Sequence, residues 1–313
     1  MKILIIRLSS LGDVVLTTPV PRLLRKKFPN SEIHFITKSE YSDIYINNNN
    51  VNKVINLEQN LKKTIKFLKF EKYDLVIDLH NNLRSNVIKY SLSVKHLTYN
   101  KQSFARWLFS NLKIKLVIKH ITKSYIETLN NLDIEDDDKG LDLFLHEKDL
   151  YDINKMPIKF RNGFYVLVLG GKYKTKRLPV DKSIELCDKI NRPIVLIGGK
   201  NEYSDSLKIE KFFRREKDDD DVSDILNKRT IIHNLCGKLS ILESAWILKL
   251  SNVVYTNDTG FMHIASALQK KVVSIFGSTH PSLGFFPYKT NFYVYQNTNI
   301  SCRPCTCLLY KSP

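Results

Sequence analysis

The sequence has no long apolar run. No stretch of its 313 residues approaches the roughly 18 uncharged apolar residues that a membrane-spanning helix needs. The apolar stretch at the start is interrupted by Arg7 and Asp13, which does not fit the core of a secretory signal peptide. We therefore expect a cytoplasmic protein without a membrane span.

Cysteine is scarce as well. Five cysteines, an odd number, do not form the disulfide framework of a small secreted domain. Cys187 and Cys236 stand among apolar residues and are expected in the core. The other three lie in the tail, residues 301–313: Cys302, Cys305 and Cys307. The first two of these have a metal-like spacing, but no second pair accompanies them, so we expect a disordered tail rather than a zinc site.

Signatures of nucleic-acid and P-loop proteins are also missing. No stretch interleaves basic and aromatic residues as a groove for single-stranded nucleic acid does. The glycines nowhere have the Gly-x4-Gly-Lys-[Ser/Thr] spacing of a P-loop. Acidic residues are outnumbered, because 49 Lys and Arg oppose 32 Asp and Glu and give a net charge of +17. This excess favours anionic partners, among which the missing aromatic interleaving disfavours nucleic acid.

What the sequence does contain is a regular alternation of short apolar runs and amphipathic stretches. Strands are predicted over residues 2–6, 32–37, 53–57 and 74–79, and again over 164–170, 192–199, 229–235, 252–258 and 270–277. Helices fit between them, and this alternation predicts parallel sheets. Pro19 and Pro21 in the first helical stretch predict a kink or a late helix start.

The length of the chain predicts two domains. It exceeds the ~250–300 residues at which single cores stop growing. The stretch 148–163 contains proline, glycine and mixed charge, as domain boundaries do. We therefore expect an α/β protein with two Rossmann-like doubly wound domains facing each other across a cleft. The predicted domains are residues 1–155 and 156–300, followed by the short Cys-rich tail.

The strongest chemical signal lies in the second half. The strand at 252–258 ends in Asp258, and Thr259 and Gly260 lead directly into a helix. A glycine, a hydroxyl and a helix N-terminus suit a phosphate group, and His263 lies on the first turn of the same helix. Residues 277–279 form a second small polar turn after the next strand. In the alternative interpretation, Asp258 is a simple N-cap and His263 is a surface histidine. Two adjacent polar turns favour the phosphate site over this alternative.

A basic loop precedes another helix of the second half. The preceding strand ends in Gly170 and Gly171. The basic residues of the loop are Lys172, Lys174, Lys176 and Arg177. Its place at the carboxyl end of a strand favours anion binding over solvated lysines. Glu202 follows the next strand, where it either binds ribose hydroxyls, as the acidic residue of dinucleotide folds does, or lies in solvent.

The first half opens with a strand that runs into Ser9, Ser10, Gly12 and Asp13. Asp13 is either a general base that faces a cleft or the N-cap of the following helix. A second polar turn, with His80, Asn81 and Arg84, follows the strand at 74–79. It either binds a ligand or is a hydrogen-bonded loop.

Taken together, these segments resemble the ADP-heptose lipopolysaccharide heptosyltransferases, glycosyltransferase family 9. The resemblance rests on ILIIRLSSLGDVVLTTP at the start, on KTKRLP in the middle and on NDTGFMHIASAL with VSIFGSTHP near the end. Their order and spacing are similar to the family over nearly the whole chain.

The resemblance implies an inverting glycosyltransferase of the GT-B type that transfers heptose from ADP-heptose to a lipopolysaccharide inner-core acceptor, Kdo-lipid A. The first domain would bind the acceptor and the second the nucleotide sugar. We expect no obligatory metal cofactor, because a lysine and helix N-termini can stabilise the departing charge. We also expect a monomer on the cytosolic face of the inner membrane that contacts the membrane surface and binds no nucleic acid.

The resemblance also implies roles for single residues. Asp13 would be the general base and Lys176 would neutralise the leaving diphosphate. The donor nucleotide would be bound by Gly171, Glu202, Asp258, Thr259, Gly260 and His263. The acceptor side would consist of Ser9, Ser10, Gly12 and Arg84.

Two departures from the family pattern keep other functions open. Leu178 stands where the family usually has an aromatic residue, which leaves a glycosyltransferase with a different nucleotide-sugar donor as an alternative. The chain stops shortly after SCRPC, where some relatives continue. A second alternative is therefore a shortened, non-catalytic protein that binds nucleotides or polyanions.

Overall fold

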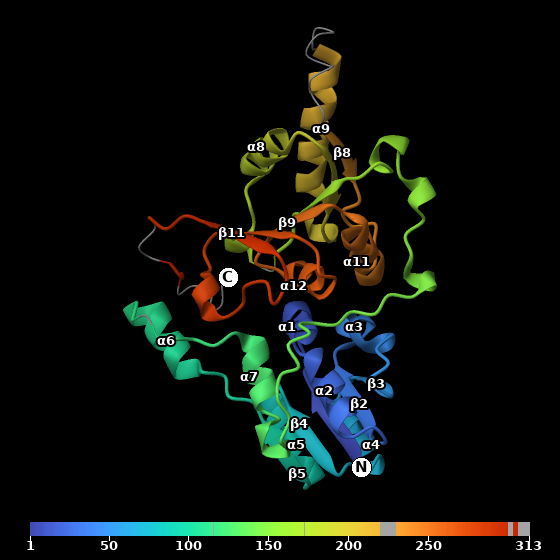
Figure 1. The fold of residues 1–313 in the computed structure, drawn as a ribbon, viewed down its shortest axis with the longest axis vertical. Coiled ribbons are helices and arrows are strands. Elements are labelled where there is room, and N and C mark those ends of the chain that lie inside the picture. The colour runs from blue at the N-terminus through green and yellow to red at the C-terminus, as the bar shows by residue number, and fades with distance from the viewer. Residues whose placement is uncertain (115, 172, 220–229, 300–302, 306–313) are drawn as a thin grey trace. The chain divides into compact units, whose positions relative to one another are not determined.

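The computed structural model of the chain describes residues 1–114, 116–171, 173–219, 230–299 and 303–305 (Figure 1). It consists of two compact units. Unit 1 comprises Met1–His146 and Ser282–Lys289, and unit 2 comprises the other described residues from Glu147 onward. The first unit thus ends nine residues before the predicted boundary at 155, and it takes back a short segment from late in the chain.

Unit 1 is built on a parallel five-stranded sheet with the order β3-β2-β1-β4-β5. Its strands are β1 (Lys2–Ile6), β2 (Glu32–Thr37), β3 (Lys53–Asn56), β4 (Leu75–Asp78) and β5 (Lys95–Thr98). Its helices are α1 (Leu11–Leu16), α2 (Pro19–Lys27), α3 (Asp43–Ile46), α4 (Leu61–Phe70), α5 (Leu83–Leu92), α6 (Ser103–Leu112) and α7 (Ile121–Glu127). The core lies against β1 and β4, whose apolar residues are buried.

Unit 2 is built on a parallel six-stranded sheet with the order β11-β10-β9-β6-β7-β8. Its strands are β6 (Tyr165–Val168), β7 (Pro193–Ile197), β8 (Ile231–Asn234), β9 (Val253–Asn257), β10 (Val272–Phe276) and β11 (Phe292–Gln296). Its α-helices over the described residues are α8 (Val180–Ile190), α9 (Tyr203–Asp219), α11 (Ile241–Leu250) and α12 (Gly260–Ala267). The two sheets confirm the predicted α/β class with two doubly wound domains.

Most predicted elements form. Each predicted strand contains an observed one, whereas β5 and β11 were not predicted. The proline pair acts as predicted, because α1 ends at Leu16 and Pro19 is the first residue of α2, where its missing N–H leaves no partner unsatisfied. No helix among the described residues is long and apolar enough to cross a membrane.

The sheet registers bring particular turns together. In unit 1 the strand order reverses between β1 and β4, and Ile6 pairs with Asp78, so the turns after these two strands are neighbours. In unit 2 the order reverses between β6 and β9, where Val168 pairs with Thr256. Ligands of doubly wound folds bind at such reversal points, outside the carboxyl ends of the strands.

The segment Ser282–Lys289 packs into unit 1. The ring of Tyr288 stacks on His120 with 4.4 Å between centroids, and Nε2 of His120 lies 2.9 Å from the carbonyl oxygen of Phe286. The carbonyl oxygen of Gly284 accepts a hydrogen bond from the backbone N–H of Ile121. Gly284 has a φ of +85°, and a Cβ there would lie 2.6 Å from a backbone oxygen of Lys119, so only glycine fits.

The tail differs in part from the expectation of disorder. Arg303 is buried, and the backbone N–H of Cys305 donates to the carbonyl oxygen of Ser278. The expectation was therefore wrong for residues 303–305, because a charged side chain finds several backbone acceptors there. Cys187 and Cys236 are buried free thiols, and burial raises the thiol pKa of each to about 12. Cys302 and Cys307 lie outside the described residues.

Candidate active site

Asp13 lies at the third position of α1, directly after β1. The N-cap of this helix is Ser10, so the interpretation of Asp13 as the N-cap was wrong. Instead Asp13 completes a capping box, because its Oδ2 accepts hydrogen bonds from the backbone N–H of Ser10 at 3.2 Å and from its hydroxyl at 2.8 Å. Ser9 and Gly12 belong to the same turn. The arrangement fixes the carboxylate while leaving a fifth of the side chain exposed.

The ionic partner of Asp13 is Arg7, which was not predicted as a site residue. Its Nη2 lies 2.9 Å from Oδ1 of Asp13. The same guanidinium donates to the carbonyl oxygens of Ser9 at 2.9 Å and Leu79 at 2.6 Å, and so joins the turns after β1 and β4. Burial lowers the pKa of Arg7 and the charge of Asp13 raises it, with a net increase. A buried charge is kept only with such partners, so Arg7 permanently holds a positive charge beside the carboxylate.

The turn after β4 is shaped by Asp78, which is fully buried. Its carboxylate accepts hydrogen bonds from the backbone N–H groups of His80 and Asn81, and it pairs with Lys89 at 3.3 Å. The turn is therefore a hydrogen-bonded loop, as one of the two interpretations held. Burial, followed by the charge of Arg7, lowers the pKa of His80 to about 4. Within the described residues its Nδ1 is buried and makes no hydrogen bond.

Two further cations of unit 1 lie near this site, and neither was predicted. Burial and the charge of Arg7 lower the pKa of Lys101, with a further contribution from Arg106, while Asp13 raises it. Nε and Nη2 of Arg106 are buried and have no hydrogen-bond partner in the part of the chain that the structure describes. By contrast, the predicted Arg84 is exposed on the first turn of α5. A lysine whose pKa is lowered by burial and by neighbouring arginines suits an anionic ligand.

In unit 2 the basic loop and the turn after β9 meet. Nζ of Lys176 lies 2.7 Å from Oδ2 of Asp258, and both side chains are mostly buried. Thr259, not Asp258, is the N-cap of α12, so the alternative of Asp258 as a simple N-cap was wrong. His263 is 3% exposed on the first turn of this helix, which also excludes a surface histidine. Gly260 begins the helix, and the predicted turn residues are therefore together.

Glu202 lies at the end of a short 3-10 turn after β7 and is buried. Its Oε1 pairs with Nη2 of Arg177 at 2.7 Å, and its Oε2 accepts a hydrogen bond of 2.9 Å from the backbone N–H of Gly199. Nε of Arg177 in turn donates to the carbonyl oxygen of Gly171 at 2.8 Å. Glu202 is thus tied to the basic loop, and the alternative that places it in solvent was wrong.

The polar turn after β10 is held from two sides. The hydroxyl of Ser278 donates to the carbonyl oxygen of Thr175 at 2.9 Å, which joins this turn to the loop that carries Lys176. Nη2 of Arg303 donates to the carbonyl oxygens of Phe276 at 3.2 Å and Thr279 at 2.7 Å. Arg303 was not predicted, because nothing in its local sequence shows which turn it reaches.

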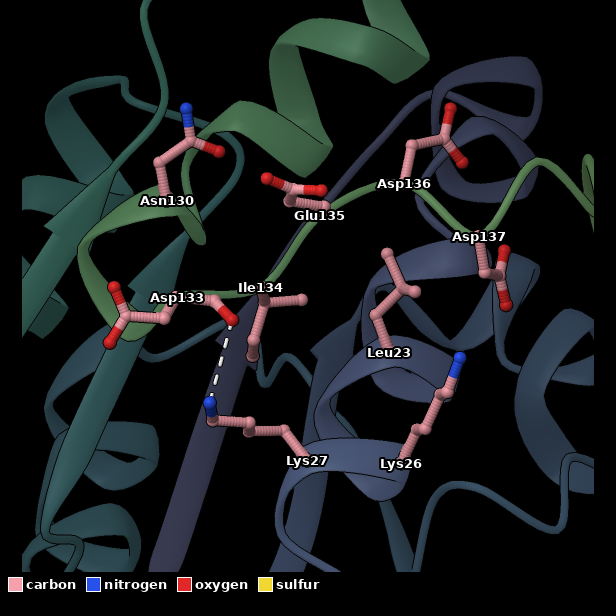
Figure 2. A pocket seen from close by; sticks show the side chains of 9 residues that line it. All are labelled: Leu23, Lys26, Lys27, Asn130, Asp133, Ile134, Glu135, Asp136 and Asp137. Carbon is pink, nitrogen blue, oxygen red and sulfur yellow. Dashed lines mark hydrogen bonds between the residues drawn. The ribbon is translucent and has the colours of Figure 1, made fainter.

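A hollow of about 800 Å³ elsewhere in unit 1 contains none of the predicted site residues (Figure 2). It is lined by Leu23, Lys26, Lys27, Asn130, Asp133, Ile134, Glu135, Asp136 and Asp137. Two of its carboxylates have partners: Asp137 pairs with Arg22 at 2.8 Å, and Asp136 accepts from Tyr288 and Lys289. The contacts of Asp136 fasten the segment 282–289 to unit 1, so we assign this side of the hollow a structural role.

Comparison with known proteins gives a family. Residues 61–309 match glycosyltransferase family 9 (heptosyltransferase). The chain is 25% identical to lipopolysaccharide heptosyltransferase 1 of Campylobacter coli, covering 89% of this chain and 84% of that protein. It is 20% identical to lipopolysaccharide heptosyltransferase 2 of Escherichia coli, covering 90% of this chain and 84% of that protein.

Solved structures agree on the fold. The structure of Escherichia coli ADP-heptose lipopolysaccharide heptosyltransferase II is similar with a TM-score of 0.75 at 19% identity, over 96% of this chain and 92% of that chain. Escherichia coli heptosyltransferase WaaC with ADP is similar with a TM-score of 0.69 at 20% identity, over 99% and 97%. The family match covers most of the sequence, and the fold agrees with it. The chain belongs to glycosyltransferase family 9 (heptosyltransferase) and is a glycosyltransferase.

Proposed function

We propose that this protein transfers heptose from ADP-heptose to the Kdo-lipid A inner core of lipopolysaccharide, with inversion at the anomeric carbon. The observation that carries the proposal is the Asp13 carboxylate, which Arg7 and Ser10 hold at the reversal point of the first sheet while part of it stays exposed. The names of the relatives, which are lipopolysaccharide heptosyltransferases, support the substrate class. Unit 1 is the acceptor domain and unit 2 the donor domain in this proposal.

On the acceptor side, Asp13 acts as the general base. It takes the proton of the acceptor hydroxyl while that oxygen forms a bond to the anomeric carbon and the bond from this carbon to the diphosphate oxygen breaks. Ser9, Ser10 and Gly12 shape the turn that presents the carboxylate. Arg7 favours the charged form before transfer, since a buried guanidinium loses its counter-charge when Asp13 is protonated.

The anionic groups of the acceptor would bind the cations of unit 1. Lys101 and Arg106 are the best placed, because they lie near Arg7 and two nitrogens of Arg106 have no hydrogen-bond partner within the described chain. A carboxylate or phosphate there would relieve the repulsion between these cations. Arg84, which is exposed on α5, is an outer contact in this proposal.

On the donor side, Lys176 neutralises the leaving diphosphate. Its partner in the structure is Asp258, at 2.7 Å. We propose that Lys176 turns to the diphosphate when the donor binds, while Thr259, Gly260 and the N-terminus of α12 supply hydroxyl and N–H donors. His263 is on the first turn of the same helix.

The nucleoside part of the donor would lie beside Glu202. This carboxylate is buried, and Arg177 and Gly199 fix both of its oxygens, so its orientation is set before a ribose arrives. Gly171 borders the same loop, because its carbonyl oxygen accepts from Arg177. No metal is required in this proposal, because Lys176 and the N–H groups carry the charge stabilisation.

The test is a transfer reaction with the purified protein. ADP-heptose and Kdo-lipid A are incubated with the enzyme, and the acceptor is followed by mass, with chelator present in a parallel sample. A gain of one heptose supports the proposal. Transfer only from another nucleotide sugar in a donor panel would replace the donor and would direct attention to Leu178 and Glu202.

A further inference from the structure

The helix α6 and the residues after it carry an exposed apolar surface in unit 1. We call it the α6 surface, and its exposed apolar members are Phe104, Trp107, Leu112, Ile114, Leu116 and Val117. Their exposed fractions run from 42% for Leu116 to 95% for Val117. Large apolar side chains that gather along one segment differ from scattered exposed residues and mark an interaction site.

The helix α6 has one side buried against unit 1, and its exposed face carries large apolar side chains instead of polar ones. Phe109 and Ser110 are buried at 6% and 1% exposure and anchor it to unit 1. Phe104 and Trp107, which lie three residues apart and so on one face, point outward at 72% and 45% exposure. In Figure 1, α6 is drawn apart from the strands β4 and β5 of its own unit.

The same segment is strongly basic. Residues 101–119 contain five cations and no acidic residue: Lys101, Arg106, Lys113, Lys115 and Lys119. Segments that combine Trp, Phe and Leu with Lys and Arg lie in the interface plane of membranes, where the apolar side chains enter the headgroup boundary. The cations at the same time attract anionic headgroups.

We propose that the α6 surface docks unit 1 on the anionic surface of a phospholipid bilayer. The charge complementarity selects a bilayer rather than an apolar protein groove, because the described segment carries Lys101, Arg106 and Lys113 beside its apolar side chains. Lys119 contributes less to this charge, because it pairs with Glu127 at 2.5 Å. The inference rests on the proposed function in one respect, namely that the acceptor is a glycolipid held in a membrane. Docking would then bring Lys101 and Arg106, which belong to the docking segment and lie near Arg7, to the headgroup level.

The chain allows a direct spectroscopic test. It contains only two tryptophans, Trp107 and Trp246, so the full-length Trp246→Phe protein reports on the α6 surface alone. Vesicles of phosphatidylglycerol and phosphatidylethanolamine, with bromine on the acyl chains, should quench Trp107 emission. Vesicles of phosphatidylcholine should give at least about tenfold weaker binding because the charge attraction is absent. These vesicles contain no glycolipid, so the result does not depend on catalysis.

Substitutions then locate the surface. Phe104→Ser with Val117→Ser should weaken cosedimentation with the anionic vesicles by about tenfold or more. Phe70→Ser is the matched control, because this side chain is 84% exposed on α4, outside the α6 surface. The proposal is overturned if the emission of Trp107 is not quenched, or if both variants lose the same amount of vesicle binding. It is also overturned if the protein self-associates without lipid and Phe104→Ser abolishes this association. That result would assign the surface to a second copy of the chain.

A separate readout keeps the proposed function distinguishable. Transfer to a short-chain acceptor in detergent-free solution should be equal in the wild type and the Phe104→Ser, Val117→Ser protein. Vesicle binding without transfer in either protein would contradict the proposed function alone. Transfer without vesicle binding would contradict the docking surface alone.

Discussion

Nη2 of Arg303 and the carbonyl oxygen of Thr279 are joined by a hydrogen bond of 2.7 Å. The same nitrogen also reaches the carbonyl oxygen of Phe276 at 3.2 Å. The turn between these two carbonyls carries Ser278, whose hydroxyl is bound to the loop that contains Lys176. Arg303 is thus a positioning residue for the proposed diphosphate site.

Arg303→Ala should raise the KM for the nucleotide sugar by about tenfold with a smaller change in kcat, because two buried carbonyls lose a donor worth ~1–3 kcal/mol. Arg303→Lys should restore part of the affinity for ADP in calorimetry. Arg192→Ala, which removes an exposed arginine of the same unit, is the control. Unchanged ADP affinity together with a lower melting temperature would show that Arg303 only stabilises the fold.

Asp13→Asn should lower kcat by about 10²–10⁴-fold, the usual contribution of a general base, and leave the affinity for ADP unchanged. The amide can still accept from Ser10, so the turn is retained, although the buried Arg7 loses its counter-charge. Turnover and calorimetric ADP binding are measured on the same preparation, with Asp43→Asn on α3 as control. A parallel loss of both quantities would make Asp13 a structural residue.

Lys176→Ala should lower kcat/KM by about 10²-fold and weaken ADP binding, because the charge that meets the leaving diphosphate is lost. Lys176→Arg should retain a substantial part of the binding. The control is Lys182→Ala, which removes a lysine that is 60% exposed and pairs with Glu185 on α8. ADP binding that stays at the wild-type level in the alanine variant would contradict the role.

His80 should make the protein less stable in acid. Its pKa is lowered from 6.5 to about 4 by burial and by Arg7, so the folded state disfavours its protonation. Stability from the neutral ring is therefore complete above pH 6.5 and is lost as pH falls from there toward 4. Urea unfolding at pH 7 and pH 4.5 should show a smaller difference for His80→Gln than for the wild type, and an equal difference would refute the shift.

Strands and turns were predictable because they depend on local sequence. Apolar runs such as residues 2–6 predict buried parallel strands, and glycine and hydroxyl residues mark the turns that follow. β5 and β11 escaped prediction: β5 contains three charged or polar residues in KHLT, and in β11 partly exposed tyrosines alternate with more buried residues. Edge strands bury less of their surface and so keep a weaker apolar pattern.

The site was predictable only as far as its residues stand beside a strand end. Asp13, Lys176 and Asp258 follow strands, and within each unit the reversal of strand order brings the turns after neighbouring strands together. Arg7 and Arg303 were missed, since their roles come from carbonyl groups of distant turns that no local pattern reveals. Whether Asp13 caps a helix or faces a ligand was also undecidable from sequence, because the same carboxylate accepts from Ser10 and Arg7 at once.

The return of Ser282–Lys289 to unit 1 has a consequence for synthesis of the chain. Residues 1–146 of unit 1 leave the ribosome before unit 2, yet the partners of His120 and Asp136 are Phe286, Tyr288 and Lys289. Unit 1 is therefore completed only after residues 147–281 of unit 2 have emerged. A gene cut after residue 146 would yield a half whose aromatic and ionic partners reside in the other fragment.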